Sequence, residues 1–391
     1  MREIIPINGE WKFADHFRTE YSTADFDDSD FLPIDVPHTN KELPYNYFDE
    51  RDYMFVSCYR RQLKIPARHA GKNVHIDFEG VMAYAQVYVN GRFVGEHKGG
   101  YTPFSFDLTD YLDFNQTNML AVMVDSSERK DIPPFGRVVD YLTFGGIYRE
   151  VRLRIVGDVF IENVFARPGG IMDEQKSLDV TMHIINKNKT RQEINLALKL
   201  IKDGCEIAKT NVAAAIDGAC KSSIEAVFTQ LANIELWDVD SPQLYELEVN
   251  LHAEDEPVDS YDVRIGFRDA WTKEDGFYLN GRKIKIRGLN RHQFYPYVGY
   301  AMPERVQKKD ADILKYELGL NAVRTSHYPQ SRHFLDRCDE IGLLVLEEMP
   351  GWQHIGDQEW KQVALANLAE MIERDWNHPS VILWGVRINE S

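Results

Sequence analysis

The chain has 391 residues, of which 43% are hydrophobic and 12% aromatic, so it is long and apolar enough for roughly two to four domains. Its net charge of -17 comes without a basic stripe, which argues against nucleic acid and anionic membranes as partners. We expect neither kind of partner.

The amino-terminal segment 1–6 has no long apolar stretch, and no run approaches the roughly 18 apolar residues that cross a bilayer. The four cysteines form no CxxC pair, so zinc and thioredoxin-like sites are disfavoured and free thiols are expected. They are Cys58, Cys205, Cys220 and Cys338. Together these features predict a cytoplasmic protein.

Residues 1–156 are predicted to form a β domain. Asn8-Gly9 and Asn90-Gly91 favour hairpin turns, because both central positions of such a turn need positive φ angles. Residues 84–89, just before the second dipeptide, alternate in the way of a strand. Short strands with frequent turns predict a β-sandwich of the jelly-roll kind.

Residues 157–270 alternate more regularly between apolar and polar side chains. This period of two is typical of half-buried antiparallel strands, and about 110 such residues fit an immunoglobulin-like β-sandwich. The apolar positions are Leu178, Val180, Met182 and Ile184, then Ile194, Leu196, Leu198 and Leu200, then Tyr245, Leu247, Val249 and Leu251, and finally Tyr261, Val263, Ile265 and Phe267.

Residues 271–391 change to an alternation of strands and helices. Strands are predicted at 283–287, 321–325, 343–347 and 380–390, and helices at 303–318, 331–341 and 359–376. Strict alternation predicts a parallel sheet or barrel. Because a complete (β/α)8 TIM barrel needs roughly 250 residues, this segment is expected to form its first four strands.

Polar residues follow each of these four strands. The carboxyl ends of barrel strands hold the chemistry of barrel enzymes, so four polar endings in order predict an active site. The endings are Asn290-Arg291-His292, the segment 324–329 with Arg324 and His327, Glu347-Glu348, and Asn389-Glu390. The alternative is that each histidine is an ordinary hydrogen-bonded loop residue.

The carboxylates in these endings need partners. Glu347 and Glu348 follow an apolar strand, so at least one of them lies at the edge of the core, where Arg324 or a metal ion could neutralise it. Glu390 follows a buried strand, and desolvation there would raise its pKa, as a general acid requires. Cleavage of a glycoside with retention needs a second carboxylate within about 5.5 Å as nucleophile, and by position Glu348 is one candidate.

These motifs, in this order, resemble glycoside hydrolase family 2, and its β-galactosidases most closely. Segments 87–91, 99–104 and 144–149 resemble the sugar-binding jelly roll of that family, and 236–245 its immunoglobulin-like domain. The most specific segments are 287–292, 321–329, 377–380 and the terminal Asn389-Glu390. The resemblance covers nearly the whole chain.

The resemblance implies a retaining glycosidase with Glu390 as general acid/base. Asn389 would hydrogen-bond the 2-hydroxyl of the sugar, a contact that strengthens in an oxocarbenium-like transition state. The nucleophile would come from a later strand, beyond residue 391, so this chain alone is expected to be inactive.

Further roles follow from the same resemblance. His292 and His327 would bind sugar hydroxyls, and Asp125 or Asp131 would reach the sugar subsite from the first domain. Glu348 matches the position that ligates Mg²⁺ in magnesium-dependent members, with Arg324 supporting the site.

Two departures from the family pattern bear on these roles. Segment 385–388 has one residue more than many members before Asn389, so we predict a bulge near 385–387 that keeps Glu390 facing inward. Segment 349–352 (Met-Pro-Gly-Trp) stands where magnesium-dependent members carry a further histidine ligand, which counts against Mg²⁺.

The sugar is expected to be a terminal β-galactoside, because segment 299–302 resembles the β-galactosidases more than the β-glucuronidases. A β-glucuronidase specificity is one alternative. Another is that the chain is a non-catalytic carbohydrate-binding module or a fragment that works only when a second chain completes the barrel. A homo-oligomer is a candidate assembly.

Overall fold

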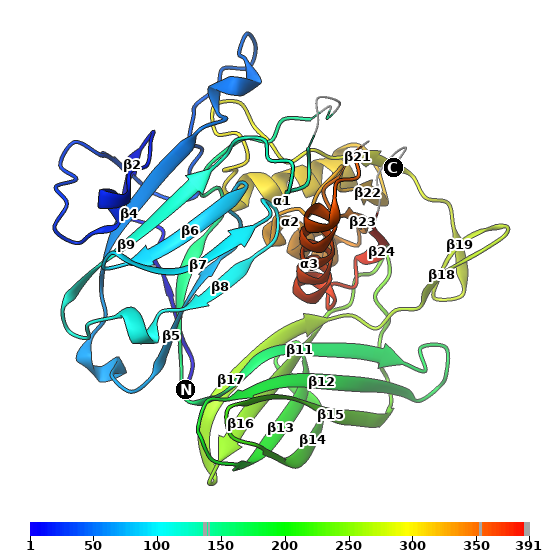
Figure 1. Cartoon of the computed structure of the whole chain (residues 1–391). Helices are drawn as coiled ribbons and strands as arrows, with labels where there is room; N and C mark the ends of the chain where they lie inside the picture. The colour runs from blue at the N-terminus through cyan, green and yellow to red at the C-terminus, as the bar shows by residue number, and fades with distance from the viewer. Residues whose placement is uncertain (136–138, 140, 352–353, 387–391) are drawn as a thin grey trace.

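The computed structural model of the chain describes residues 1–135, 139, 141–351 and 354–386. This part of the chain contains two β-sandwiches, a small three-stranded antiparallel sheet, and a four-stranded parallel sheet with its helices (Figure 1). The first sandwich is blue to cyan, the second green, and the parallel sheet with its helices yellow to red.

The first sandwich has the two antiparallel sheets expected of a jelly roll. One contains, in spatial order, β1 (Glu3–Pro6), β10 (Val151–Val156), β5 (Asn73–Phe78) and β8 (Phe104–Asp107). The other contains β3 (Leu32–Ile34), β2 (Trp11–Ala14), β4 (Val56–Lys64), β9 (Thr117–Asp125), β6 (Tyr84–Val89) and β7 (Arg92–Lys98). Ile76, Val87 and Val122 are fully buried between the sheets, and each such side chain contributes about 1.5–3 kcal/mol.

The two predicted hairpins in this domain have different outcomes. Asn90 and Gly91 have φ angles of 51° and 77° and join the paired strands β6 and β7, as predicted. The prediction of a hairpin at Asn8-Gly9 is wrong, because β1 and β2 belong to different sheets. There Asn8 accepts a hydrogen bond from the backbone N–H of Val151 at 2.9 Å, and this long-range contact replaces the local turn.

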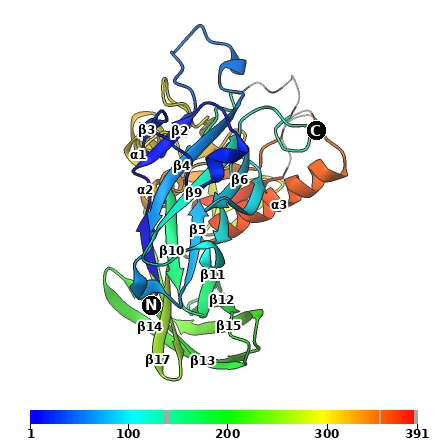
Figure 2. The same cartoon turned by 60° about the vertical axis from the view of Figure 1, so that its left-hand side comes forward.

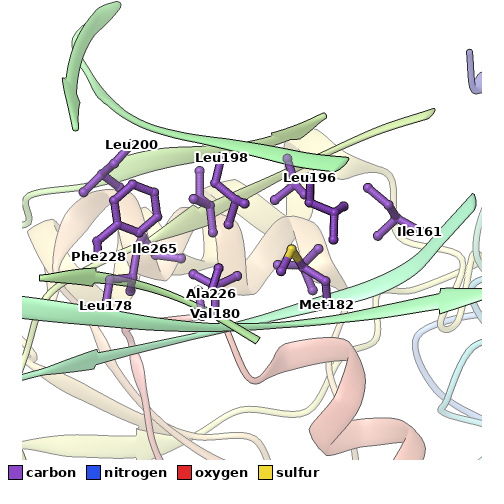
Figure 3. Close-up of a cluster of buried hydrophobic side chains, with 14 of the residues drawn as sticks. Ile161, Leu178, Val180, Met182, Leu196, Leu198, Leu200, Ala226, Phe228 and Ile265 are labelled. Carbon is purple, nitrogen blue, oxygen red and sulfur yellow. The ribbon is translucent and has the colours of Figure 1, made fainter. Parts of the chain in front are cut away.

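The second sandwich has three strands facing four, an immunoglobulin-like arrangement. The sheets are β11 (Val159–Gly169), β12 (Lys176–Asn186) and β15 (Cys220–Leu231), and β14 (Cys205–Ile216), β13 (Gln192–Lys202), β16 (Tyr245–Ala253) and β17 (Glu256–Ile265). Leu196 and Leu198 of β13 point toward Val180 and Met182 of β12, and all four are buried (Figure 3). The predicted alternation is confirmed for β12, β13 and β16.

The third part alternates strand and helix as predicted. Its elements are β21 (Gly288–Asn290), α1 (Glu304–Asp312), β22 (Ala322–Arg324), α2 (Arg332–Ile341), β23 (Leu344–Glu348), α3 (Gln358–Asp375) and β24 (Val381–Gly385). The strands pair in parallel in the order β21-β22-β23-β24, which is the first half of a (β/α)8 barrel. Ser331 caps α2 at its start, and Gly342 ends it with a φ of 69°.

The predicted first barrel strand at 283–287 is wrong. The Asn280-Gly281 turn folds β20 (Arg282–Ile284) back onto β19 (Gly276–Leu279), which also pairs with β18 (Ala270–Lys273), so these strands form a separate antiparallel sheet. The barrel instead begins at Gly288, where an added Cβ would lie only 2.8 Å from the carbonyl oxygen of Ala322.

A bulge occurs in β24, at a different place from the predicted 385–387. Val345 pairs with Val381 and Leu346 with Leu383, which leaves Ile382 as the extra residue, whereas Gly385 pairs regularly with Glu348. Arg387 and everything after it lie outside the described residues.

The three parts contact one another through polar side chains. Arg2, near the amino terminus, pairs with the buried Asp259 of the second sandwich at 2.9 Å. Helix α3 lies beside the first sandwich (Figure 1, Figure 2), and Lys98 at the end of β7 pairs with Glu359 of α3 at 2.6 Å. Across the described ranges, no helix combines the length and the apolar character needed to cross a membrane.

Candidate active site

The predicted histidines meet at the carboxyl ends of the parallel strands. His292 follows β21 by two residues, and His327 follows β22 by three. Their ring centroids are 5.6 Å apart. Because parallel strands end at one edge of the sheet, residues far apart in sequence converge there.

Glu348, the last residue of β23, holds His327 in place. One of its carboxylate oxygens pairs with Arg324, and the other lies 3.1 Å from Nδ1 of His327. A carboxylate only accepts hydrogen bonds, so Nδ1 of His327 carries the hydrogen in this contact, and a ring with a single hydrogen would accept through Nε2. This hydrogen is assigned from the contact geometry.

Gly385 leaves room for this arrangement. A Cβ at that position would lie 2.6 Å from Cγ of Glu348, so any other residue would displace the carboxylate. The lack of a side chain at Gly385 on β24 therefore allows Glu348 on β23 to keep its position.

Glu347 faces the opposite side of β23. It is fully buried and pairs with Arg374 of α3 at 3.2 Å. Burial, together with the nearby charge of Asp375, raises the pKa of Glu347 well above its ordinary value. Of the two adjacent glutamates, Glu348 is therefore the one that contacts His327.

Tyr141 of the first domain completes the cluster, and sequence reasoning missed it. Its ring centroid lies 5.8 Å from that of His292 and 5.7 Å from that of His327. Its only signal in the sequence is its place just before the 144–149 segment. An aromatic ring there offers an apolar face beside two polar rings.

A cavity of about 570 Å³ opens beside Tyr141, within the usual size range of ligand pockets. One part of its wall is apolar and another carries charged and hydroxyl side chains. The lining residues are Phe48, Asp49, Glu50, Arg51, Met54, Met82, Ala83, Ser126, Ser127, Glu128, Arg129, Ile132, Pro133, Pro134, Val139, Tyr141 and Thr143.

Asp125 and Asp131 lie next to this cavity without lining it. Arg129 pairs with both, at 3.3 Å and 3.1 Å, and Lys98 pairs with Asp131 at 2.8 Å. Burial alone would raise the pKa of Asp131, but hydrogen bonds from Arg129 and Lys98 outweigh it and lower the pKa to about 2. Contact of either aspartate with a sugar stays a prediction.

Magnesium has no complete ligand set among the described residues around Glu348. Both oxygens of Glu348 are engaged by Arg324 and His327, and Pro350 stands two residues later. Mg²⁺ takes six oxygen ligands in octahedral geometry, so Mg²⁺ at Glu348 stays a prediction that needs ligands from elsewhere.

One other group of residues has the spacing of a metal site. Asp336, Asp339 and His378 bring ligand atoms within 4.8 Å of one another. Burial would lower the pKa of His378, but the charges of Asp339 and Asp375 raise it to about 9. A protonated imidazole cannot ligate a metal, and Arg264 pairs with Asp336 at 3.0 Å, so cations already neutralise this group.

The two residues with the most direct predicted roles, Asn389 and Glu390, lie outside the described residues. Their roles as sugar ligand and general acid/base stay predictions. The described part of the site is the cluster of His292, His327 and Glu348 with Tyr141 beside it.

Three family models match the chain in succession. "Glycosyl hydrolases family 2, sugar binding domain" matches residues 5–156, "Glycosyl hydrolases family 2" matches 159–268, and "Glycosyl hydrolases family 2, TIM barrel domain" matches 271–391.

Individual proteins are similar over the same length. A β-galactosidase of Thermoanaerobacterium thermosulfurigenes is 56% identical, over 100% of this chain and 54% of the relative, and one of Thermoanaerobacter pseudethanolicus is 50% identical, over 100% and 52%. The crystal structure of a β-glucuronidase of Bacteroides uniformis has a TM-score of 0.91 at 32% identity, over 98% of this chain and 46% of that one. The chain thus spans about half the length of the curated relatives it matches.

Proposed function

The chain belongs to glycosyl hydrolase family 2, and we propose that the protein containing it removes terminal β-galactosides with retention of configuration. The observation that carries this proposal is the convergence of His292, His327 and Glu348 at the strand ends beside a cavity. Two relatives that are 56% and 50% identical to this chain over the aligned residues are named β-galactosidases, which supports the choice of sugar.

In this proposal Glu390 donates a proton to the leaving oxygen and then activates water, while Asn389 hydrogen-bonds the sugar 2-hydroxyl. The nucleophile comes from the part of the protein outside this chain, which the greater length of the relatives supports. His292 and His327 bind other hydroxyls, and His327 accepts a hydrogen bond through Nε2.

The proposal is tested with the full-length protein and an aryl β-galactoside. We expect Glu390→Gln to lower kcat by roughly 10²–10⁴-fold, because the amide can neither donate nor take up the proton. Glu193→Gln, on an exposed position of the second sandwich, is the matched control and keeps the parental rate. Unchanged turnover in Glu390→Gln would remove Glu390 from the reaction.

A β-glucuronide is the second candidate substrate, favoured by the similarity to the Bacteroides uniformis enzyme. A glucuronidase needs a cation for the substrate carboxylate, so the aryl β-galactoside and the aryl β-glucuronide are compared under the same conditions. A higher kcat/KM for the glucuronide would overturn the galactoside assignment.

A carbohydrate-binding or complementation-dependent fragment is the alternative for the isolated chain. Galactose binding in a calorimeter without hydrolysis would favour it. Turnover by the isolated chain would show that the catalytic groups are all present within it.

We also propose the cytoplasm as the compartment, supported by four cysteines that are all unpaired. Homo-oligomer formation is a further proposal, and the mass of the full-length protein in solution tests it.

A further inference from the structure

We infer that Arg149 is a positioning residue that aligns the loop carrying His292 with the loop carrying His327. The first domain would thereby take part in the reaction without this side chain touching the substrate. The inference rests on the proposed function, in which both histidines bind the sugar.

Arg149 lies two residues before β10 and is only 4% exposed. Nη1 donates to the carbonyl oxygen of Tyr101 at 2.9 Å and to that of Glu79 at 3.3 Å, both in the first domain. Nη2 donates to the carbonyl oxygen of Pro329 at 2.7 Å and contacts Oε1 of Gln293 at 3.5 Å, both in the barrel. One guanidinium thus spans the junction of two domains.

The two barrel partners of Arg149 lie in the histidine loops. Gln293 directly follows His292, and Pro329 follows His327 by two residues. Gln293 also joins the loops to each other, because its Oε1 accepts from the N–H of Ser331 at 2.6 Å and its N–H donates to the hydroxyl of Tyr328 at 3.0 Å. Arg149 therefore contacts the point where the two loops are already linked.

Aromatic packing makes the same junction rigid. The ring of Tyr328 stacks on that of Tyr101 with centroids 4.5 Å apart and an interplanar angle of 16°. Arg149 binds the carbonyl of Tyr101 on one side of this stack and that of Pro329, next to Tyr328, on the other. A shift of either loop would break contacts with both the ring and the guanidinium.

The hydrogen bonds of Arg149 indicate that it sets the positions of the two histidine loops rather than the stability of the fold. It is a buried cation whose hydrogen bonds go to neutral oxygens, and its Nε has no hydrogen-bond partner among the described residues. Removing a cation from water is costly, and these hydrogen bonds are what offsets that cost for Arg149. An apolar side chain of similar volume would remove the charge but leave the carbonyl oxygens without these donors. What the apolar replacement lacks is the planar set of donors that fixes three carbonyls in relation to one another.

The test uses the full-length protein with Arg149→Met, Arg149→Lys and the control Arg60→Met. Arg60 is fully buried in the same domain and donates to the carbonyls of Tyr21 and Thr23, away from both histidine loops. Hydrogen exchange is followed in peptides covering 290–294 and 326–331. Hydrolysis of an aryl β-galactoside is measured at temperatures where every variant is folded.

We expect Arg149→Met to speed exchange in both peptides and to lower kcat by roughly 10–100-fold with a smaller change in KM, since misplaced groups cost most in the transition state. Arg149→Lys should recover part of the rate, and Arg60→Met should change neither peptide. Parental kcat, or unchanged exchange, in Arg149→Met would overturn the inference. Lack of galactoside hydrolysis by the parent protein would instead refute the proposed function, and the exchange result would still decide the positioning role.

Discussion

At the scale of single residues, Glu348 determines what His327 can offer a ligand. Its carboxylate accepts from Nδ1 of that ring, so Nε2 becomes the acceptor, and Arg324 supplies the opposite charge. Glu348 and His327 therefore act as a pair. Without Glu348, the ring of His327 would not have one defined nitrogen as donor and the other as acceptor.

We predict that Glu348→Gln lowers kcat/KM by roughly 10–100-fold, because the amide cannot pair with the charge of Arg324 and holds His327 through one oxygen at most. Glu348→Asp keeps the negative charge on a shorter side chain, so its kcat/KM should lie between those of the parent protein and Glu348→Gln. Steady-state kinetics of the full-length variants measure the effect, with Glu193→Gln as control. A variant with parental kcat/KM would show that the orientation of His327 does not limit the reaction.

Magnesium binding to Glu348 can be separated from this role. If Glu348 is a ligand, calorimetric uptake of Mg²⁺ by the chelator-treated full-length protein disappears in Glu348→Gln. Equal uptake by both proteins would remove Glu348 from any metal site.

Sequence reasoning found the two histidines and Glu348 but missed the residues of the first domain that contact or position them. His292, His327 and Glu348 follow apolar strands, and that position alone marks them as members of a site. Tyr141 and Arg149 come from a loop of another domain, where neither periodicity nor spacing relates them to a strand end. Only the packing of the two domains brings them to the histidines.

At the scale of elements, the regular strands and helices and the parallel sheet were predictable, whereas the pairing of 283–287 and the bulge position in β24 were not. The alternation in 283–287 is the same whether the strand joins an antiparallel hairpin or a parallel sheet, and the Asn280-Gly281 turn decides for the hairpin. The bulge at Ile382 likewise depends on how β24 meets β23, which the sequence of β24 does not contain.

The pairing of β21 with β22 depends on Gly288. Because a Cβ there would lie 2.8 Å from the carbonyl oxygen of Ala322, we expect Gly288→Ala to lower the free energy of unfolding by about 1–3 kcal/mol. Thermal or urea unfolding measures this decrease in the free energy of unfolding. Gly157→Ala is the control, since a Cβ at that position meets nothing closer than 3.9 Å. Equal stability of the two variants would mean that β21 moves away at little cost.

At the scale of the whole molecule, charged side chains join the domains across partly buried contacts. Arg264 of the second sandwich pairs with Glu340 of α2 at 2.9 Å and with Asp336 at 3.0 Å. His378, just before β24, lies 2.6 Å from Asp339 of the same helix. The segment that leads into β24 is thus held by the helix that contacts the second sandwich.

This network predicts a dependence of stability on pH. Burial favours neutral His378, but Asp339 and Asp375 outweigh it and raise its pKa from 6.5 to about 9. Since the folded-state pKa is the higher one, the stabilisation is fully present below pH 6.5 and is lost as the pH rises through about 9. The difference corresponds to a contribution on the order of 3 kcal/mol.

We therefore expect the full-length protein to lose thermal stability between pH 6.5 and 9. His378→Gln should be less stable than the parent protein at pH 6, but its stability should change little between pH 6.5 and 9. His16→Gln, at an exposed position of the first domain, should follow the parent protein throughout. The two curves for parent and His378→Gln should converge only above about pH 10, because the imidazole is then neutral in both the folded and the unfolded chain. Parallel curves across the interval would mean that His378 is not charged in the folded protein, and its contact with Asp339 would then be an ordinary hydrogen bond that carries no linkage to pH.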